Sequence, residues 1–259
     1  TDSLMEELEF FLSRLSKSIF KSIIGIGISV PGIVNEEGKF IEFNSKNKTD
    51  ISIIGKIKKK FNIPVLVENL SAIAEAFLSE NSLLSNFTAL TINDYVGISS
   101  FTREKNQNNF HFKAGRMHHM IVNPEGRICN CGSRGCWGAY VSNPALVEEF
   151  HKVFKKIKKY ENIFQNEYLE TKEGKKILDE YIKYLAIGIK NLLFFSNPEK
   201  LIISGKICHQ QKYIKEKLLE EIYNEHIFYR GKETIIFSSF EENSSLIGAA
   251  IFPIVDSLF

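Results

Sequence analysis

The chain has 259 residues, of which 44% are hydrophobic and 25% are charged. This composition is typical of a globular protein, and no segment approaches the roughly 18 consecutive apolar residues of a membrane span. The 33 basic and 31 acidic residues leave a net charge of only +2, so the overall balance does not predict a nucleic-acid surface. Residues 1–18 carry acidic side chains where a signal peptide would be basic and apolar, so we expect a cytoplasmic protein.

The first third of the chain alternates between helix and strand signals. In order they predict helix, strand, helix, strand and helix, at residues 4–15, 22–30, 51–61, 64–67 and 71–79. A polar stretch follows at residues 81–86 and is the best candidate for a domain boundary. This alternation indicates an α/β protein whose sheets are covered by helices.

The remaining two thirds begin with two apolar runs, 87–92 and 96–101, whose polar connection predicts a hairpin. After a further strand and a cysteine-rich loop, the pattern is mainly helical. The later predictions are a long helix, a strand, a helix, a strand and a closing apolar segment, at residues 175–195, 200–204, 213–224, 233–237 and 248–258.

Two lysine-rich stretches require a separate interpretation. Residues 56–60 and 152–160 interleave lysine with apolar side chains at helical spacing. The pattern predicts two amphipathic helices with solvated basic faces, rather than two phosphate-binding sites.

Three of the four cysteines stand within eight residues, in the run Cys129-Asn-Cys131-Gly-Ser-Arg-Gly-Cys136. His119 precedes this run by ten positions, and the glycines let the backbone curl so that three sulfurs face one point. Three thiolates and one imidazole are a common ligand set for zinc. The sequence therefore predicts a zinc site formed by these four residues.

Two alternatives remain open for this site. The cysteines are also compatible with three unrelated reduced thiols, and His118 or His111 is near enough in sequence to replace His119 as a ligand. With four protein ligands no coordination position is left for water, so the predicted zinc is structural rather than catalytic. Such a site contributes on the order of 10 kcal/mol to folding.

Four segments together resemble the ROK family, whose name stands for repressor, open reading frame and kinase. They are Gly25-Ile-Gly-Ile-Ser-Val-Pro-Gly32, Val67-Glu-Asn69, His119 with the cysteine run, and Ser245-Leu-Ile-Gly-Ala-Ala250. The resemblance extends over residues 23–254, and the histidine with three cysteines is its most specific part.

The resemblance implies a two-lobed α/β fold of the actin and hexokinase type, also called ribonuclease H-like, with an incomplete N-terminal lobe. We expect a smaller lobe at residues 1–84, completed by a C-terminal helix at 246–259, and a larger lobe at 85–245 that holds the zinc loop. Family members are either sugar kinases or repressors that sense a sugar in the cleft between the lobes. The family usually dimerises through its larger lobe, and the helix at 175–195 is the candidate contact, although its apolar stripe fits an ordinary core better.

Kinase members need a carboxylate that takes the proton of the attacking sugar hydroxyl. The resemblance places this base at position 70, where the chain has leucine. The glycine-rich turns with which the family holds ATP are also missing: one has no counterpart, while those aligned with residues 93–99 and 204–206 each keep a single glycine. These differences predict a protein that is not an enzyme.

Sugar recognition differs from the family as well. Two glutamates that accept hydrogen bonds from sugar hydroxyls in the family align with Arg116 and Gly138, while Asn44, Asn69 and His119 remain as candidate ligand-binding residues. Asn44 and Asn69 are equally suited to turns or helix caps. Arg116 suits an anionic effector such as a sugar acid or sugar phosphate, but the more favoured alternative is that it pairs with a local acid or points to water.

The predicted function is therefore the effector-sensing and dimerisation part of a ROK-type transcriptional regulator, without catalysis. Its expected partners are a sugar or anionic sugar derivative, a second copy of the chain, and DNA only through a winged helix-turn-helix outside this sequence. There are two alternatives. The first is a sugar kinase whose catalytic residues lie at positions other than those aligned here. The second is a family member that is retained for protein interaction alone.

Overall fold

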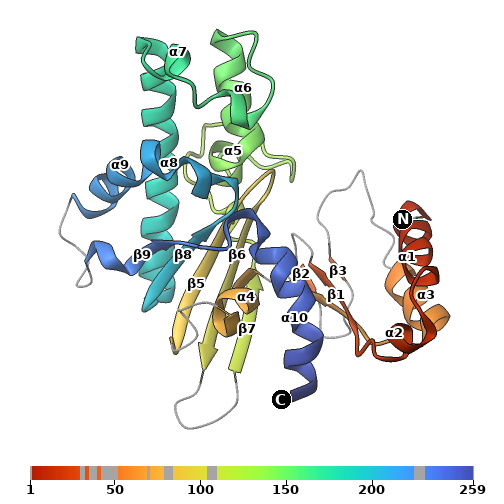
Figure 1. Ribbon diagram of the computed structural model, residues 1–259. Coiled ribbons are helices and arrows are strands. Elements are labelled where there is room, and N and C mark those ends of the chain that lie inside the picture. Colours follow the sequence, from red (N-terminus) through yellow and green to blue (C-terminus); the bar gives the residue numbers. More distant parts are fainter. Residues whose placement is uncertain are drawn as a thin grey trace.

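The computed structural model describes residues 2–29, 33–34, 40–41, 52–68, 71–78, 84–103, 110–224 and 231–258. Within these ranges the protein is a mixed α/β structure in which a five-stranded sheet and its helices form the larger body (Figure 1). The N-terminal helices and short strands lie to one side of this body, and the C-terminal helix runs between the two parts (Figure 1). The arrangement agrees with the predicted two-lobed fold.

The N-terminal part consists of short elements. Their bounds are α1 Asp2–Ser13, α2 Lys17–Lys21, β1 Ile26–Ser29, β2 Ile33–Val34, β3 Phe40–Ile41, α3 Ser52–Phe61, β4 Val65–Glu68 and α4 Ser71–Leu78. Strand β1 pairs in parallel with β4, which requires the crossover that contains α3. Strands β2 and β3 form a separate antiparallel pair.

The larger part is built on one mixed sheet with strand order β7-β6-β5-β8-β9. Its strands are β5 Asn86–Ile92, β6 Val96–Arg103, β7 Phe110–Gly115, β8 Lys200–Ser204 and β9 Ile235–Phe237. Strands β5, β6 and β7 are antiparallel neighbours, whereas β8 runs parallel to both β5 and β9. The predicted hairpin at residues 87–101 is thereby confirmed, with Asn93 donating its backbone N–H to the Tyr95 carbonyl at 3.0 Å.

The larger part also contains helices and 3₁₀ turns, which lie between and after the sheet strands in sequence. Their bounds are η2 Met117–His119, α5 Gly138–Val141, α6 Asn143–Val153, η3 Tyr160–Asn162, α7 Asn166–Leu169, α8 Lys172–Ser196, η4 Lys206–Gln210, α9 Gln211–Tyr223, η5 Lys232–Thr234, η6 Glu241–Asn243 and α10 Ser244–Leu258. The long predicted helix at 175–195 corresponds to α8, which begins at the N-cap Thr171 and ends at Asn197 in a left-handed conformation.

Side chains alternate between the two faces of the sheet, because successive residues of a strand point in opposite directions. On β5, Leu90 and Ile92 join the large core under α5–α9, whereas Phe87 and Ala89 join a second core with Ala76 of α4. Both faces are covered, which explains why β5 is a nearly continuous apolar run.

Helix α4 connects the two parts of the molecule. Its Ala76 packs in the core under Phe87 and Phe101 of the sheet, while its Ile73 packs with Ala249 of α10. Helix α4 precedes residue 84 but packs against the sheet of the larger part as well as against α10. The predicted domain boundary near residue 84 therefore stays a prediction.

The two glycines of β1 provide the space in which α10 lies. A Cβ at Gly27 would come 1.9 Å from the Ala249 carbonyl oxygen, and one at Gly25 would come 2.7 Å from Pro253. Any larger residue would push α10 away from β1. The Gly-x-Gly pair therefore has a packing role and does not form a phosphate loop.

The lysine-rich stretch at 152–160 corrects the sequence prediction. Helix α6 ends at Val153, and residues 154–159 form a turn and an irregular segment instead of the predicted helix. Apolar residues spaced by three fit a helix as well as an irregular segment. In the structure Ile157 is fully buried, and its carbonyl accepts a hydrogen bond from His151 Nδ1 at 2.8 Å. The other stretch does form a helix, α3, with Ile57 buried and Lys58 exposed.

Candidate metal centre and effector cleft

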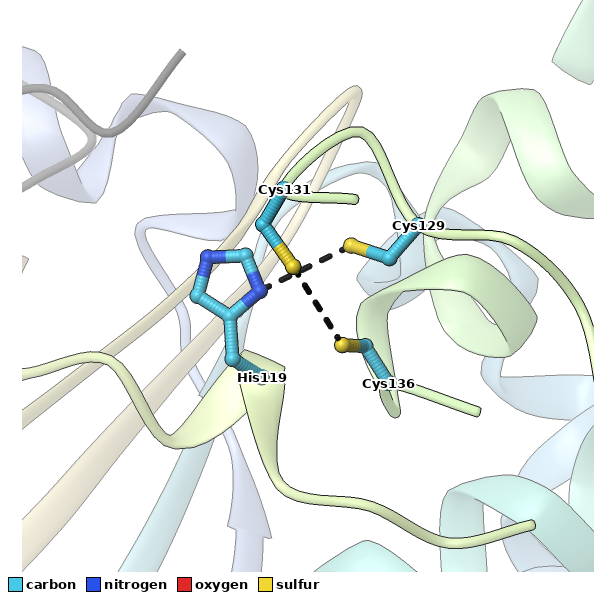
Figure 2. Close-up of side chains that lie close together, drawn as sticks. All are labelled: His119, Cys129, Cys131 and Cys136. Carbon is cyan, nitrogen blue, oxygen red and sulfur yellow. Dashed lines mark hydrogen bonds between the residues drawn. The ribbon is translucent and has the colours of Figure 1, made fainter. Parts of the chain in front are cut away.

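Four potential metal ligands converge between η2 and α5. The sulfurs of Cys129, Cys131 and Cys136 and a ring nitrogen of His119 all lie within 4.8 Å of one another. Figure 2 shows the four side chains turned toward one point. The sulfur of Cys129 lies 3.6 Å from His119 Nδ1, and the sulfurs of Cys131 and Cys136 are 3.7 Å apart.

These separations fit a tetrahedral metal ion. Zinc bonds of about 2.3 Å to sulfur and about 2.0–2.1 Å to nitrogen place tetrahedral ligand atoms about 3.5–3.8 Å apart. A disulfide would instead require about 2.05 Å between sulfurs. The donor set and its geometry therefore suit a closed metal site, in which the metal would crosslink η2 to the cysteine loop.

The cysteine loop is held by its own backbone. The N–H of Cys129 donates to the Ser133 carbonyl at 2.8 Å, and Gly132, with φ +90°, donates to the Cys129 carbonyl at 2.9 Å. Gly135 has φ +76°, and a Cβ there would lie 1.8 Å from the Asn123 carbonyl oxygen. Both glycines occupy conformations that other residues rarely adopt, as the sequence predicted for a curled loop.

Trp137 joins the loop to the core of the larger part. It follows Cys136 directly, is fully buried, and donates its indole N–H to the Tyr184 carbonyl of α8 at 2.8 Å. Arg127, in the same loop, lies over the ring of Tyr140 and pairs with Glu149 of α6 at 3.2 Å. The loop thus rests on two helices, and disturbing it must disturb them.

A bound cation would favour ionisation of the buried thiol of Cys136. Burial, followed by hydrogen bonds with the two neighbouring sulfurs, raises the pKa of Cys136 to about 12. At Cys131 burial also opposes ionisation, but hydrogen bonds from Ser133 and from the other sulfurs outweigh it, so the pKa is lowered. A divalent cation would stabilise all three thiolates together, because metal binding displaces their protons.

The histidines near the cluster differ in position. Burial, followed by the charge of Arg116, lowers the pKa of His119, which favours the neutral imidazole that binds metal. His118 is directed elsewhere: its Nδ1 is buried and has no hydrogen-bond partner in the described part of the chain. His111 lies on β7 and is not a member of the cluster. His119 is therefore the histidine that the fold places among the sulfurs.

The remaining predicted site residues fall into two groups. Asn44, Asn69 and the base position Leu70 lie outside the described residues. Arg116 lies at the N-cap of η2, three residues before His119, and a Cβ at Gly138 would lie 3.5 Å from that of His118. Gly138, one of the two positions that the resemblance assigns to sugar-binding glutamates, therefore lies against His118, which follows the other position, Arg116, by two residues.

A cavity of about 930 Å³ lies on the larger part, at the hairpin turn. Its lining includes Asp94, Asn143, Tyr160 and Lys206, none of which the sequence singled out individually. Asn93 holds this region together: its carbonyl accepts the Asn143 N–H and its side-chain oxygen accepts the Lys206 N–H, both at 2.9 Å. These contacts join residues 50 to 113 positions apart, so no local pattern could predict them.

The sheet order, the two parts and the cysteine loop define an actin- and hexokinase-like protein with a candidate metal site. The sequence matches the ROK family over residues 1–254. The chain belongs to the ROK family. Among the described helices, none is both long enough and apolar enough to cross a membrane.

Its relatives include regulators and kinases. The chain is 29% identical over 224 residues to the xylose repressor of Bacillus spizizenii, covering 85% of this chain and 58% of the repressor. The ROK hexokinase of Thermus thermophilus has a TM-score of 0.75 at 19% identity, covering 91% of this chain and 80% of the hexokinase. A ROK transcriptional regulator homologous to the E. coli MLC protein also has a TM-score of 0.75 at 20% identity, covering 98% of this chain and 69% of the regulator.

Proposed function

We propose that this chain is the effector-sensing and dimerisation part of a ROK transcriptional regulator and that it does not phosphorylate sugars. One observation carries the proposal: the metal-ligand set is complete, whereas the neighbouring positions expected to bind sugar are Arg116 and Gly138. A scaffold retained without its reactive groups suits a protein that responds to a ligand and does not transform it.

Chemistry supports the absence of catalysis. Leucine at position 70 cannot accept a proton, and losing a general base costs a factor of about 100 to 10,000 in rate. Each lost hydrogen bond to a glutamate costs about 1.5–3 kcal/mol of binding free energy. Without both glutamates, a neutral hexose would bind about a hundredfold to ten-thousandfold more weakly.

The names of the relatives suggest the effector and the partners. The similar Bacillus repressor is named for xylose, so xylose is the first candidate, followed by sugar acids and sugar phosphates that suit Arg116. The chain spans 58% of that repressor, and sequence-specific DNA binding is proposed for a longer protein that carries a winged helix-turn-helix. A homodimer formed through the larger part is the proposed assembly.

We propose a structural zinc at His119, Cys129, Cys131 and Cys136. All four coordination positions would be filled by protein atoms, so the ion would supply crosslinking and no activated water. Its place beside Arg116 and Gly138 would fix one wall of the effector cleft.

The test combines binding with turnover. A ligand that binds only the folded chain raises its melting temperature, so xylose, hexoses, sugar acids and sugar phosphates are compared by thermal shift. The same sugars are assayed for ATP consumption. A shift without turnover is expected; turnover with any sugar overturns the proposal, and no shift with any compound favours the interaction-only alternative.

A sugar kinase is the second candidate function. The large cavity bordered by Asp94 and Lys206 favours it, because the resemblance assigns these two segments to the nucleotide. Calorimetric titration with ATP in the presence and absence of magnesium distinguishes the candidates, since a kinase must bind the nucleotide before it can transfer phosphate.

A further inference from the structure

The segment between α6 and η3 carries four lysines in five positions: Lys155, Lys156, Lys158 and Lys159. All four are exposed, and in the described part of the chain none forms an ion pair. Some lysines elsewhere have carboxylate partners, as shown by Lys175 with Glu170 at 2.8 Å and Lys217 with Asp179 at 2.6 Å. The segment is therefore a local concentration of positive charge in a chain whose net charge is only +2.

The acidic residues nearest in sequence are engaged with other cations. Glu148 and Glu149 pair with Lys152, at 3.6 and 2.6 Å, and Glu161 pairs with Lys206 at 2.7 Å. Lys159 contributes to the lowered pKa of Glu161 only after Lys206 and the backbone. No nearby carboxylate thus cancels the four charges by direct contact.

The segment is also anchored, so the charges are presented on a defined backbone. Ile157, at its centre, is fully buried. Its N–H donates to the Phe154 carbonyl at 3.0 Å, and its carbonyl accepts from His151 at 2.8 Å. The segment follows α6 at the end of the larger part where α6 and α7 lie (Figure 1).

We propose that this lysine segment, residues 155–159, contacts the phosphate backbone of duplex DNA. Lysine ammonium groups neutralise phosphates without reading the base sequence. Protein interfaces are depleted in lysine and need an apolar centre, but Val153 is the only large exposed hydrophobic residue described between positions 151 and 161. No exposed aromatic ring accompanies the lysines, which disfavours single strands that bind by stacking. The proposal concerns this chain itself and does not rest on the identity of an effector.

The test measures binding of the 259-residue chain to a fluorescein-labelled duplex of arbitrary sequence by anisotropy, at salt concentrations of about 50 to 200 mM. The test variant replaces all four lysines by glutamine: K155Q, K156Q, K158Q and K159Q. The matched control removes the same charge from exposed, unpaired lysines on α3 and α8: K58Q, K59Q, K176Q and K183Q. Thermal unfolding of both variants should match that of the parent chain, because no described ion pair is lost.

We expect weak, salt-dependent binding by the parent chain, with a slope of log affinity against log salt that falls by about 3 in the test variant and by less than about 1 in the control. No binding by the parent chain, or an equal loss in the control, overturns the proposal. Displacement of the duplex by inorganic phosphate beyond the effect of sodium chloride at equal ionic strength also overturns it and assigns the lysines to a small anion.

Discussion

The indole of Trp137 packs against Gly188 of α8 so closely that a Cβ at position 188 would lie 1.9 Å from the ring atom Cε2. Trp137 is the only tryptophan of the chain and directly follows Cys136. The contact therefore connects the candidate metal loop to the longest helix, and it provides a fluorescence signal that reports on the loop without an added label.

Replacing Gly188 by alanine tests this contact. Alanine favours a helix by about 1 kcal/mol over glycine, but the added methyl must displace the indole, and overpacking costs about 1–3 kcal/mol. We expect a net loss of up to about 2 kcal/mol in the free energy of unfolding in urea, with a red-shifted Trp137 emission. The control is Lys183→Ala, an exposed site on the same helix, which should leave both unchanged. Unchanged emission in Gly188→Ala would show that the indole is not held there.

Loss of a metal ligand should loosen the cysteine loop. We expect Cys131→Ser to remove most of the bound zinc and to lower the melting temperature by about 10 °C or more, because binding free energy at such a site is also folding free energy. Cys208→Ser is the matched control, since Cys208 is buried beside Ile203 and lies outside the cluster. Zinc is measured by elemental analysis and stability by calorimetry. A purified parent chain that stays equally stable in strong chelator would contradict a structural metal.

Replacing Gly27 by alanine should separate α10 from β1. The new methyl would meet the Ala249 carbonyl, which is backbone and cannot rotate away, so we expect a loss of about 2 kcal/mol or more in the free energy of unfolding. Hydrogen exchange of residues 244–258 should accelerate in this variant. Gly115→Ala serves as the control, because its Cβ would meet only Met117 Cγ at 3.9 Å. Equal exchange in both variants would argue against the packing role of Gly27.

The half-buried ring of His118 predicts a pH dependence of stability. Burial, then the charges of His119 and Arg116, lowers its pKa from 6.5 to about 4. The unfolded chain therefore binds this proton more readily than the folded chain, so stability is fully present above pH 6.5 and is lost as the pH falls toward 4, by up to about 3 kcal/mol.

Urea unfolding between pH 4.5 and 7.5 checks this dependence. His118→Asn keeps a polar side chain but does not titrate, so the difference in stability between parent and variant should grow smaller as the pH falls. A difference that is constant with pH would rule out the titration of His118 as the cause.

Local patterns were sufficient for most elements and for the cluster of candidate metal ligands. The run Lys200–Ser204 is a strand with the predicted bounds, and Cys129 to Cys136 form one curled loop, because strand alternation and glycine conformations are properties of neighbouring residues. The lysine segment was predicted wrongly for the same reason: apolar residues at positions 154, 157 and 160 fit a helix locally, and only the burial of Ile157 against distant residues decides for a turn.

The sequence by itself determined the alternation of helices and strands, the donor atoms for a metal and the resemblance to the ROK family. Only the tertiary structure decided which histidine lies with the sulfurs, that Gly25 and Gly27 make room for α10, and that Trp137 meets Gly188. Most of these relationships join residues that are far apart in the chain. The remaining one distinguishes two adjacent residues, because His119 belongs to the cluster and His118 does not. They depend on how the helices and strands pack against one another, and the spacing of residues along the chain does not specify that packing.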